Sequence, residues 1–89
     1  MKYSTEFLKQ SHRSSFENKK QILASNIVGC FYCKQLFPAT EITNEDYIQD
    51  KNSGTAECPH CCIDSVIGDA SGIELSFEFL EAMNEYYFS

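Results

Sequence analysis

Two short stretches, Cys30-Phe31-Tyr32-Cys33 and Cys58-Pro59-His60-Cys61, decide how this 89-residue chain folds. Each has the form Cys-x-x-Cys, which lets two sulfur atoms reach one ion, and two such pairs complete the four-sulfur shell of a structural zinc site. A shell of four thiolates leaves no coordination position for a substrate. The sequence therefore predicts one structural Zn²⁺ per chain, bound by Cys30, Cys33, Cys58 and Cys61.

Two other uses of paired cysteines fit this sequence less well. A dithiol redox site has a single Cys-x-x-Cys in a βαβ context, whereas this chain has two pairs and no such context. Nucleobase deaminases carry His-x-Glu and then Pro-Cys-x-x-Cys, but Pro59 lies inside the second pair and no His-x-Glu occurs. Because no nucleophile, base and orienting partner can be assembled, we expect the protein not to be an enzyme. Cys62, the remaining thiol, is expected to be a small apolar filler or an exposed thiol.

Length and composition indicate the number of domains and the cellular compartment of the protein. A chain of 89 residues forms one domain with a small core, to which a bound metal adds folding energy on the order of 10 kcal/mol. An odd count of five cysteines and an N-terminal stretch without a signal-like apolar run favour a reducing, cytoplasmic location. No stretch approaches the roughly 18 apolar residues of a transmembrane helix, so we expect no membrane contact.

Charge is distributed unevenly along the chain. The formal net charge is −6, while residues 1–29 carry five basic and two acidic side chains, and no Lys or Arg follows Lys51. An acidic body disfavours approach to a phosphate backbone. We therefore expect a protein partner with a basic surface. The alternative is a nucleic-acid or transcription-associated zinc ribbon whose basic N-terminal arm binds through Lys9, Arg13, Lys19 and Lys20.

The N-terminal part is predicted to be a helical arm over residues 1–26. Ser14-Ser15-Phe16-Glu17 has the form of a capping box, which predicts a helix over residues 15–24. Its short apolar stripe would comprise Phe16, Ile22 and Leu23. Residues 3–11 form either a separate helical turn or a loose segment.

The segment between the cysteine pairs is predicted to hold a short helix between Pro38 and Gln49, capped by Thr43, with Ile42, Tyr47 and Ile48 facing inward. A turn is expected at Asn52-Ser53-Gly54. Residues 55–57 and 63–67 are expected to be strands that enter and leave the second pair. Each cysteine pair would then lie on a β-hairpin knuckle.

The C-terminal segment has the clearest helical pattern. Ser76 is a suitable N-cap, and apolar positions recur at helical spacing at Phe79, Leu80, Met83 and Tyr87. The aromatic residues near its end either pack the helix onto the centre or form an exposed anchor for a partner, since tyrosine is favoured at interfaces. Carboxylates beside them would steer a basic partner. The candidate partner surface comprises Glu78, Glu81, Glu85, Tyr86, Tyr87 and Phe88.

Taken together, these motifs resemble a family of small, uncharacterised bacterial cytoplasmic zinc-ribbon-like proteins. The likeness covers residues 20–88 and includes residues 29–33, Phe37-Pro38, Glu41-Ile42, residues 55–61, the segment Ile63-Asp64-Ser65-Val66-Ile67-Gly68 and the aromatic C-terminal helix. The resemblance implies a zinc-bound fold and brings no established activity. This chain departs from it at Tyr87, where Trp is expected, and at Cys62, where Gly would permit a left-handed turn that closes the knuckle.

The predicted fold class is α+β, with a small zinc-ribbon-like β-hairpin centre and flanking N-terminal and C-terminal helices. Residues 1–26 would form the arm, and residues 27–89 the zinc-ribbon-like domain with its C-terminal helix, the whole chain being one folding unit. The expected function is that of a small acidic, zinc-stabilised protein-binding module, a regulator or inhibitor of a basic, nucleic-acid-handling protein.

Overall fold

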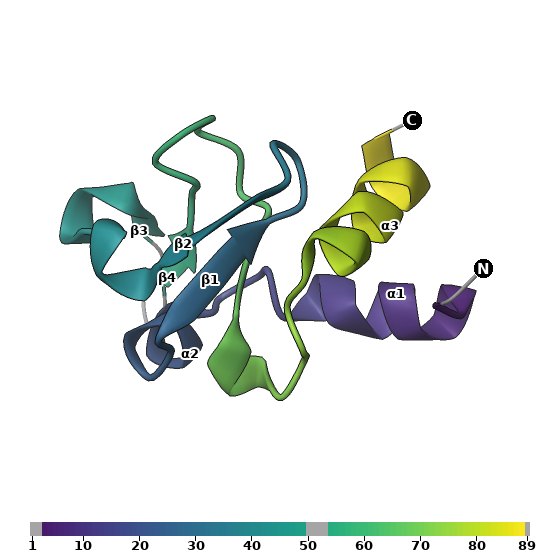
Figure 1. Cartoon of the computed structure of the whole chain (residues 1–89). Helices are drawn as coiled ribbons and strands as arrows, with labels where there is room; N and C mark the ends of the chain where they lie inside the picture. Colours follow the sequence, from purple (N-terminus) through teal and green to yellow (C-terminus); the bar gives the residue numbers. More distant parts are fainter. Residues whose placement is uncertain (1–2, 50–53, 89) are drawn as a thin grey trace.

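The computed structural model describes residues 3–49 and 54–88, in which the antiparallel strands come after the N-terminal helices and before the C-terminal helix along the chain (Figure 1). The predicted α+β architecture is thus confirmed. In chain order the elements are α1 (Thr5–Arg13), α2 (Lys19–Leu23), β1 (Ile27–Cys30), β2 (Gln35–Pro38), the 3₁₀ turns η1 (Ala39–Glu41) and η2 (Asn44–Asp46), β3 (Tyr47–Gln49), β4 (Gly54–Ala56), β5 (Val66–Gly68), the 3₁₀ turn η3 (Asp69–Ser71) and α3 (Phe77–Phe88).

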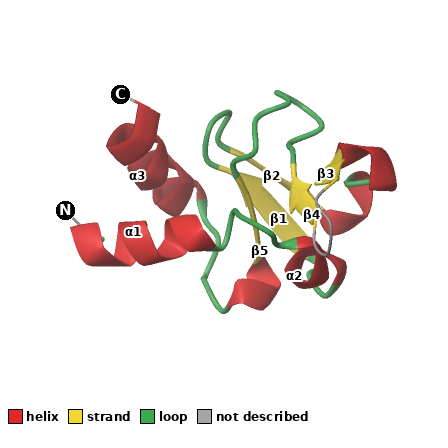
Figure 2. Ribbon diagram, turned by 180° about the vertical axis from the view of Figure 1, so that it is seen from behind, coloured by secondary structure: helices red, strands yellow, loops and turns green. Residues whose placement is uncertain are grey.

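The strands form two small antiparallel sheets. One has the order β2-β1-β5, and the other is the pair β3-β4 (Figure 2). In the central strand β1, Gly29 lies opposite both Leu36 and Ile67. An added Cβ at Gly29 would lie 3.0 Å from a methyl carbon of Leu80. Glycine at this position therefore lets α3 approach the sheet closely.

Two apolar clusters lie on the two sides of the three-stranded sheet, because successive strand residues point to opposite faces. We call them the strand core and the helix core. The strand core comprises Ile22, Val28, Cys30, Phe37, Ala39, Ile42, Tyr47, Ala56, Cys58 and Val66. The helix core, beneath α1 and α3, comprises Leu8, Phe31, Ile67, Phe79, Leu80 and Met83.

The N-terminal arm differs from the prediction. Residues 5–13 form a well-defined helix, with Ser4 accepting a hydrogen bond from the Phe7 amide. The helix predicted over 15–24 begins only at residue 19, and the capping box was wrong because Ser14 ends α1 and Glu17 adopts a left-handed φ of 47°. The predicted stripe was also wrong in part: only Ile22 is buried, while Phe16 and Leu23 are exposed.

A buried asparagine connects this arm to the strands. Asn18 is 3% exposed, and its side-chain nitrogen donates to the carbonyl oxygens of Ser14 at 2.9 Å and Val66 at 2.7 Å. Its side-chain oxygen accepts from the Ala56 amide at 3.0 Å. One side chain thus satisfies backbone groups at the C-cap of α1, in β4 and in β5.

The segment between the cysteine pairs forms strands and 3₁₀ turns where a short helix was expected. Thr43 and Asp46 do form a capping box at η2, as predicted for Thr43. Ile42 and Tyr47 are buried as predicted, but Ile48 is 44% exposed because β3 pairs only with the short strand β4. Of the turn predicted at Asn52-Ser53-Gly54, the first two residues lie outside the described ranges, and Gly54 begins β4.

The prediction of two hairpin knuckles was half right. In the first cysteine pair, Cys30 ends β1 and Cys33 lies in the turn that joins β1 to its paired strand β2. The strands flanking the second pair do not pair with each other, because β4 joins β3 and β5 joins β1. β5 is also shorter than predicted and begins at Val66, where it meets β1.

The C-terminal helix is confirmed. Ser76 Oγ accepts from the Phe79 amide at 3.1 Å, and Phe79, Leu80 and Met83 are buried, while Tyr87 is half-buried. Helices α1 and α3 lie side by side (Figures 1 and 2), where the rings of Tyr3 and Phe7 contact Phe79. None of the described helices is long and apolar enough to cross a membrane.

Candidate metal centre

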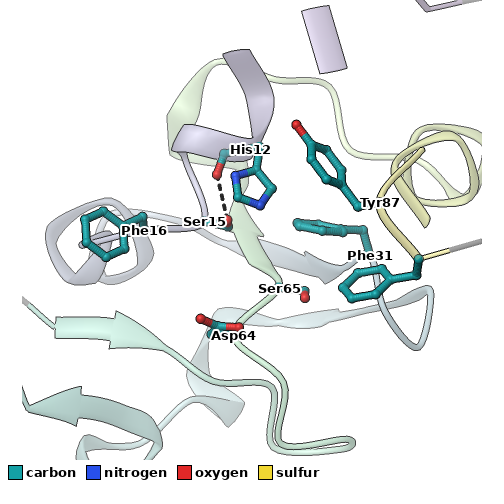
Figure 3. Close-up of a pocket in the computed structure, with 8 residues that line it drawn as sticks. His12, Ser15, Phe16, Phe31, Asp64, Ser65 and Tyr87 are labelled. Carbon is teal, nitrogen blue, oxygen red and sulfur yellow. Dashed lines mark hydrogen bonds between the residues drawn. The ribbon is translucent and has the colours of Figure 1, made fainter. Parts of the chain in front are cut away.

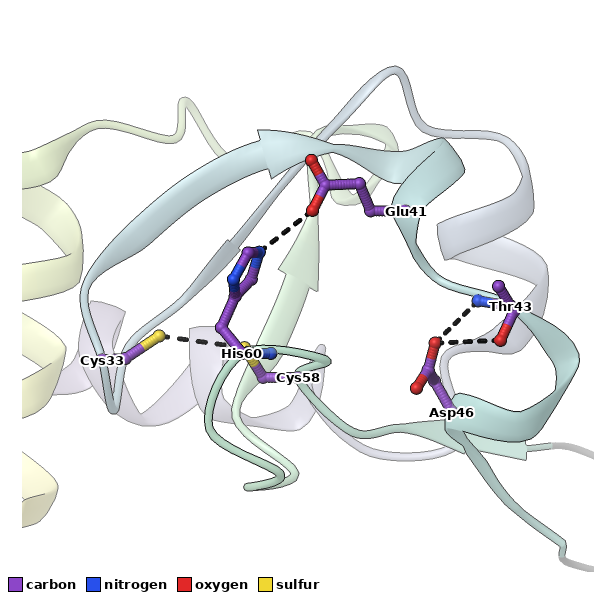
Figure 4. Close-up of polar contacts among 6 residues, drawn as sticks. All are labelled: Cys33, Glu41, Thr43, Asp46, Cys58 and His60. Carbon is purple, nitrogen blue, oxygen red and sulfur yellow. Dashed lines mark hydrogen bonds and ion pairs between the residues drawn. The ribbon is translucent and has the colours of Figure 1, made fainter.

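The structure brings the four predicted ligands together. The sulfur atoms of Cys30, Cys33, Cys58 and Cys61 all lie within 4.8 Å of one another. Cys30 and Cys61 are 3.6 Å apart, and Cys33 and Cys58 are 3.8 Å apart, the second pair being drawn in Figure 4. These four cysteines form a cluster that can hold a metal ion.

The two cysteine pairs are built alike, although only one lies on a hairpin. In the first, the Lys34 amide donates to the Cys30 carbonyl at 2.8 Å. In the second, the Cys62 amide donates to the Cys58 carbonyl at 2.7 Å. Both Lys34 and Cys62 adopt the left-handed conformation, with φ values of 61° and 66°. Cys62 therefore preserves the turn for which glycine would be suited.

Backbone amides point at one sulfur of each pair. The Tyr32 amide donates to Cys30 Sγ and the His60 amide to Cys58 Sγ, both at 3.4 Å. Such N–H groups favour a negatively charged sulfur. Because Cys30 and Cys58 are the two buried members of the cluster, the amides are aimed at the sulfurs that water reaches least.

Burial opposes ionisation in the absence of a cation. It raises the pKa of the Cys30 thiol strongly and the pKa of the Cys58 thiol to about 11, while the backbone amides act in the opposite direction. A cation that binds the thiolates reverses this preference, so metal binding would release protons. The centre therefore favours the thiolate form of its cysteines only when a metal is bound.

The spacing of the sulfurs fits a tetrahedral ion. Zinc binds thiolate at about 2.3 Å, which places the sulfurs of a tetrahedral shell about 3.8 Å apart. The separations of 3.6 and 3.8 Å agree with this value. No disulfide joins the described cysteines. The residues present therefore fit a closed, four-thiolate ion site.

The side chains next to the ligands do not enter the cluster. Cys62 was predicted to be either a small apolar filler or an exposed thiol, and it is exposed. His60 Nε2 lies 3.0 Å from Glu41 Oε1 (Figure 4). The His60 ring also packs edge-on against the ring of Phe37. His60 therefore covers the outer side of the centre and does not point toward the sulfurs.

A polar contact that the sequence analysis missed attaches α3 to the first cysteine pair. Asn84 Nδ2 donates to the carbonyl oxygens of Phe31 and Tyr32, both at 3.0 Å. The ring of Phe88 also contacts these two residues, with centroids 5.8 Å and 4.9 Å away. The available signal was spacing: Asn84 lies four residues after Leu80 and so falls on the buried face of the helix.

The predicted partner surface is largely solvent-facing. Tyr86 is 38% exposed and Phe88 is 44% exposed, while Tyr87 is half-buried against the ring of His12 at 4.4 Å. The carboxylate-bearing residues Glu78, Glu81 and Glu85 are exposed on the same helix. The end of α3 thus packs onto the centre, which was one of the two predicted alternatives, and it also presents aromatic surface to solvent.

The basic residues of the arm lie on two different helices. Lys9 and Arg13 are exposed on α1, and Lys20 is exposed on α2. Lys19 is only half-exposed, and its Nζ lies 5.2 Å from the centre of the Tyr47 ring. One of the four charges proposed for nucleic-acid contact is therefore engaged within the fold.

Comparison of the chain with protein-family models, with curated proteins and with solved structures found no match.

Proposed function

We propose that this protein is a small zinc-stabilised module that binds a protein with a basic surface, and that it acts as a regulator or inhibitor of a nucleic-acid-handling partner. It would do so without catalysis. The observation that carries the proposal is the exposed aromatic end of α3 in acidic surroundings, anchored by Asn84 to the first cysteine pair.

Zinc is the proposed ion because of the donor set. Four cysteine sulfurs, with separations suited to a tetrahedron, favour zinc among the common divalent ions. In this role the ion stabilises the fold, and the cysteines would serve only to hold it. Native mass spectrometry and elemental analysis of purified protein should find one zinc per chain. A metal-free protein with oxidised cysteines would contradict this assignment.

Charge supports a basic partner. Residues 54–88 include seven acidic side chains and neither Lys nor Arg. Long-range attraction from such a surface speeds association with a positively charged partner and weakens as salt is added. A basic partner normally uses its positive surface for nucleic acid, so occupying that surface would inhibit it. The resemblance to bacterial cytoplasmic zinc-ribbon-like proteins is consistent with an intracellular partner of this kind.

The test begins with the zinc-loaded protein as bait in host lysate. We expect a basic protein to be retained at low salt, and its purified form to bind with an affinity that falls as salt rises. Glu81→Lys should weaken the complex, whereas Glu45→Lys on η2 is the matched charge-reversal control. Competition with the partner's nucleic acid would establish inhibition. If no protein binds, or if both variants bind equally well, the proposed surface is wrong.

A further inference from the structure

A pocket lies beside the end of α3, next to the proposed partner surface. The pocket has a volume of about 280 Å³ and lies between the last turn of α1, the end of α3 and the segment before β5. Sites for drug-sized ligands are typically about 300–1,000 Å³. This pocket lies at the lower end of that range, and it has room for one long side chain. Its lining residues are His12, Ser15, Phe16, Phe31, Asp64, Ser65, Tyr87 and Phe88.

Aromatic rings form most of the wall. The centroid of the Phe31 ring lies 6.1 Å from that of Tyr87 and 5.8 Å from that of Phe88, and the His12 ring contacts Tyr87 at a tilt of 34°. Phe16, which was predicted to belong to the apolar stripe of a helix, is 60% exposed and lines the pocket. Figure 3 shows the rings of His12, Phe31 and Tyr87 gathered near one another. Ring faces attract cations through their negative quadrupole.

One carboxylate lies among these rings. Asp64 is exposed, and Figure 3 shows it across the pocket from His12 and Tyr87. The lining contains no Lys or Arg that could neutralise it. A purely apolar side chain in the pocket would offer this carboxylate no partner. A cationic side chain would pair with Asp64 while stacking on the rings.

We propose that this pocket receives an arginine side chain of the basic partner, with the guanidinium stacked on the aromatic wall and paired with Asp64. The inference rests on the proposed function and names the residue type that would be recognised. Arginine suits the pocket better than lysine because its planar group both stacks on rings and presents two donors to a carboxylate. The pocket is also tied to the metal centre, since Phe31 lies between two ligands and its amide donates to the Ser65 carbonyl at 3.0 Å.

The experiment titrates isotopically labelled, zinc-loaded protein with a capped Gly-Arg-Gly peptide, followed by NMR. The control peptide carries citrulline, the neutral isostere of arginine. We expect the arginine peptide alone to shift amide signals of residues 12–16, 64–65 and 87–88, at peptide concentrations on the order of 10 mM or below. Absence of shifts, shifts elsewhere, or equal shifts with citrulline would overturn the proposal.

Variants identify the groups involved. Asp64→Asn and Phe88→Leu should each weaken arginine binding by about two- to five-fold, the fold-change of a single exposed ion pair or cation–π contact. Glu74→Gln and Phe77→Leu are the matched controls, because both residues are exposed and neither lines the pocket. Unchanged affinity in Asp64→Asn together with Phe88→Leu would contradict the assignment.

The two proposals fail differently. If a basic protein partner binds Asp64→Asn and Phe88→Leu as tightly as it binds the wild type, the module still binds proteins but the arginine pocket is wrong. If the arginine peptide responds as expected while no protein is captured, the pocket stands and the proposed cellular function is wrong.

Discussion

Asn18 provides a quantitative test of how the arm is joined to the strands. In Asn18→Leu, a side chain of similar size replaces the amide, and the three hydrogen bonds to Ser14, Val66 and Ala56 are lost. Val66 and Ala56 are fully buried, so no water can replace the amide for them. Each buried group left unsatisfied costs about 1–3 kcal/mol. The carbonyl of half-exposed Ser14 can turn to water and adds little.

The expected loss is therefore about 2–6 kcal/mol, a large share of the roughly 5–15 kcal/mol by which small domains are stable. Urea unfolding of the zinc-loaded protein, followed by circular dichroism, measures this loss as a lower midpoint at unchanged slope. Asn44→Leu is the matched control, because Asn44 is exposed on η2; its stability should change by no more than about 0.5 kcal/mol. If Asn18→Leu proves as stable as Asn44→Leu, the assignment of Asn18 as a buried connector is wrong.

Four further outcomes are expected. Chelation of the metal, or Cys58→Ser, should abolish cooperative unfolding in calorimetry, because binding energy on the order of 10 kcal/mol is lost; retained cooperativity would show that the apolar cores suffice. Cys62→Gly should raise stability by up to about 1 kcal/mol relative to Cys62→Ser, because glycine adopts a left-handed φ without strain; a loss measured in urea would contradict this. Asn84→Leu should lower stability by about 1–3 kcal/mol and shift the NMR signals of Phe88, since two carbonyls lose their donor; an unchanged Phe88 environment would disprove the attachment. Gel shifts at low salt should detect no binding to short nucleic acids, because the net charge is −6; a salt-sensitive shift, lost in Lys9→Glu, would support the nucleic-acid alternative.

The parts of the fold that were predictable depend on local chemistry. The cysteine spacing predicted the four-sulfur cluster because each pair is a self-contained turn. The α3 helix was predictable because its cap at Ser76 and its buried residues Phe79, Leu80 and Met83 lie within one continuous segment. Thr43 was identified as a cap for the same reason, although the turn that it begins is too short to be a helix.

Long-range contacts explain what was mispredicted. The sequence Ser14-Ser15-Phe16-Glu17 satisfies the local rule for a capping box, but the Glu17 amide instead donates to Thr55 Oγ1 at 2.9 Å, across 38 residues. The Asn18 side chain likewise forms hydrogen bonds with backbone groups of β4 and β5, and no local sequence pattern predicts these contacts. The second cysteine pair does not lie on a hairpin because β5 pairs with β1 and not with β4. In the pocket beside the end of α3, Asp64 and His12 come from segments far apart in sequence, so the sequence could not predict that they lie near each other.

The unequal support of the two cysteine pairs bears on the order in which the protein assembles. Residues 30–33 are closed by the short β1-β2 hairpin, a contact between near neighbours that forms with little loss of chain entropy. Residues 58–61 are bounded by strands that pair elsewhere, so this loop is closed by two local backbone bonds, from the Cys58 amide to the Ile63 carbonyl and from the Cys62 amide to the Cys58 carbonyl, and by a metal ion when one is bound. We therefore expect the ion to be captured first by the hairpin pair, with the second pair closing onto it. In hydrogen exchange, amides of residues 57–63 should be the first to lose protection as metal is withdrawn.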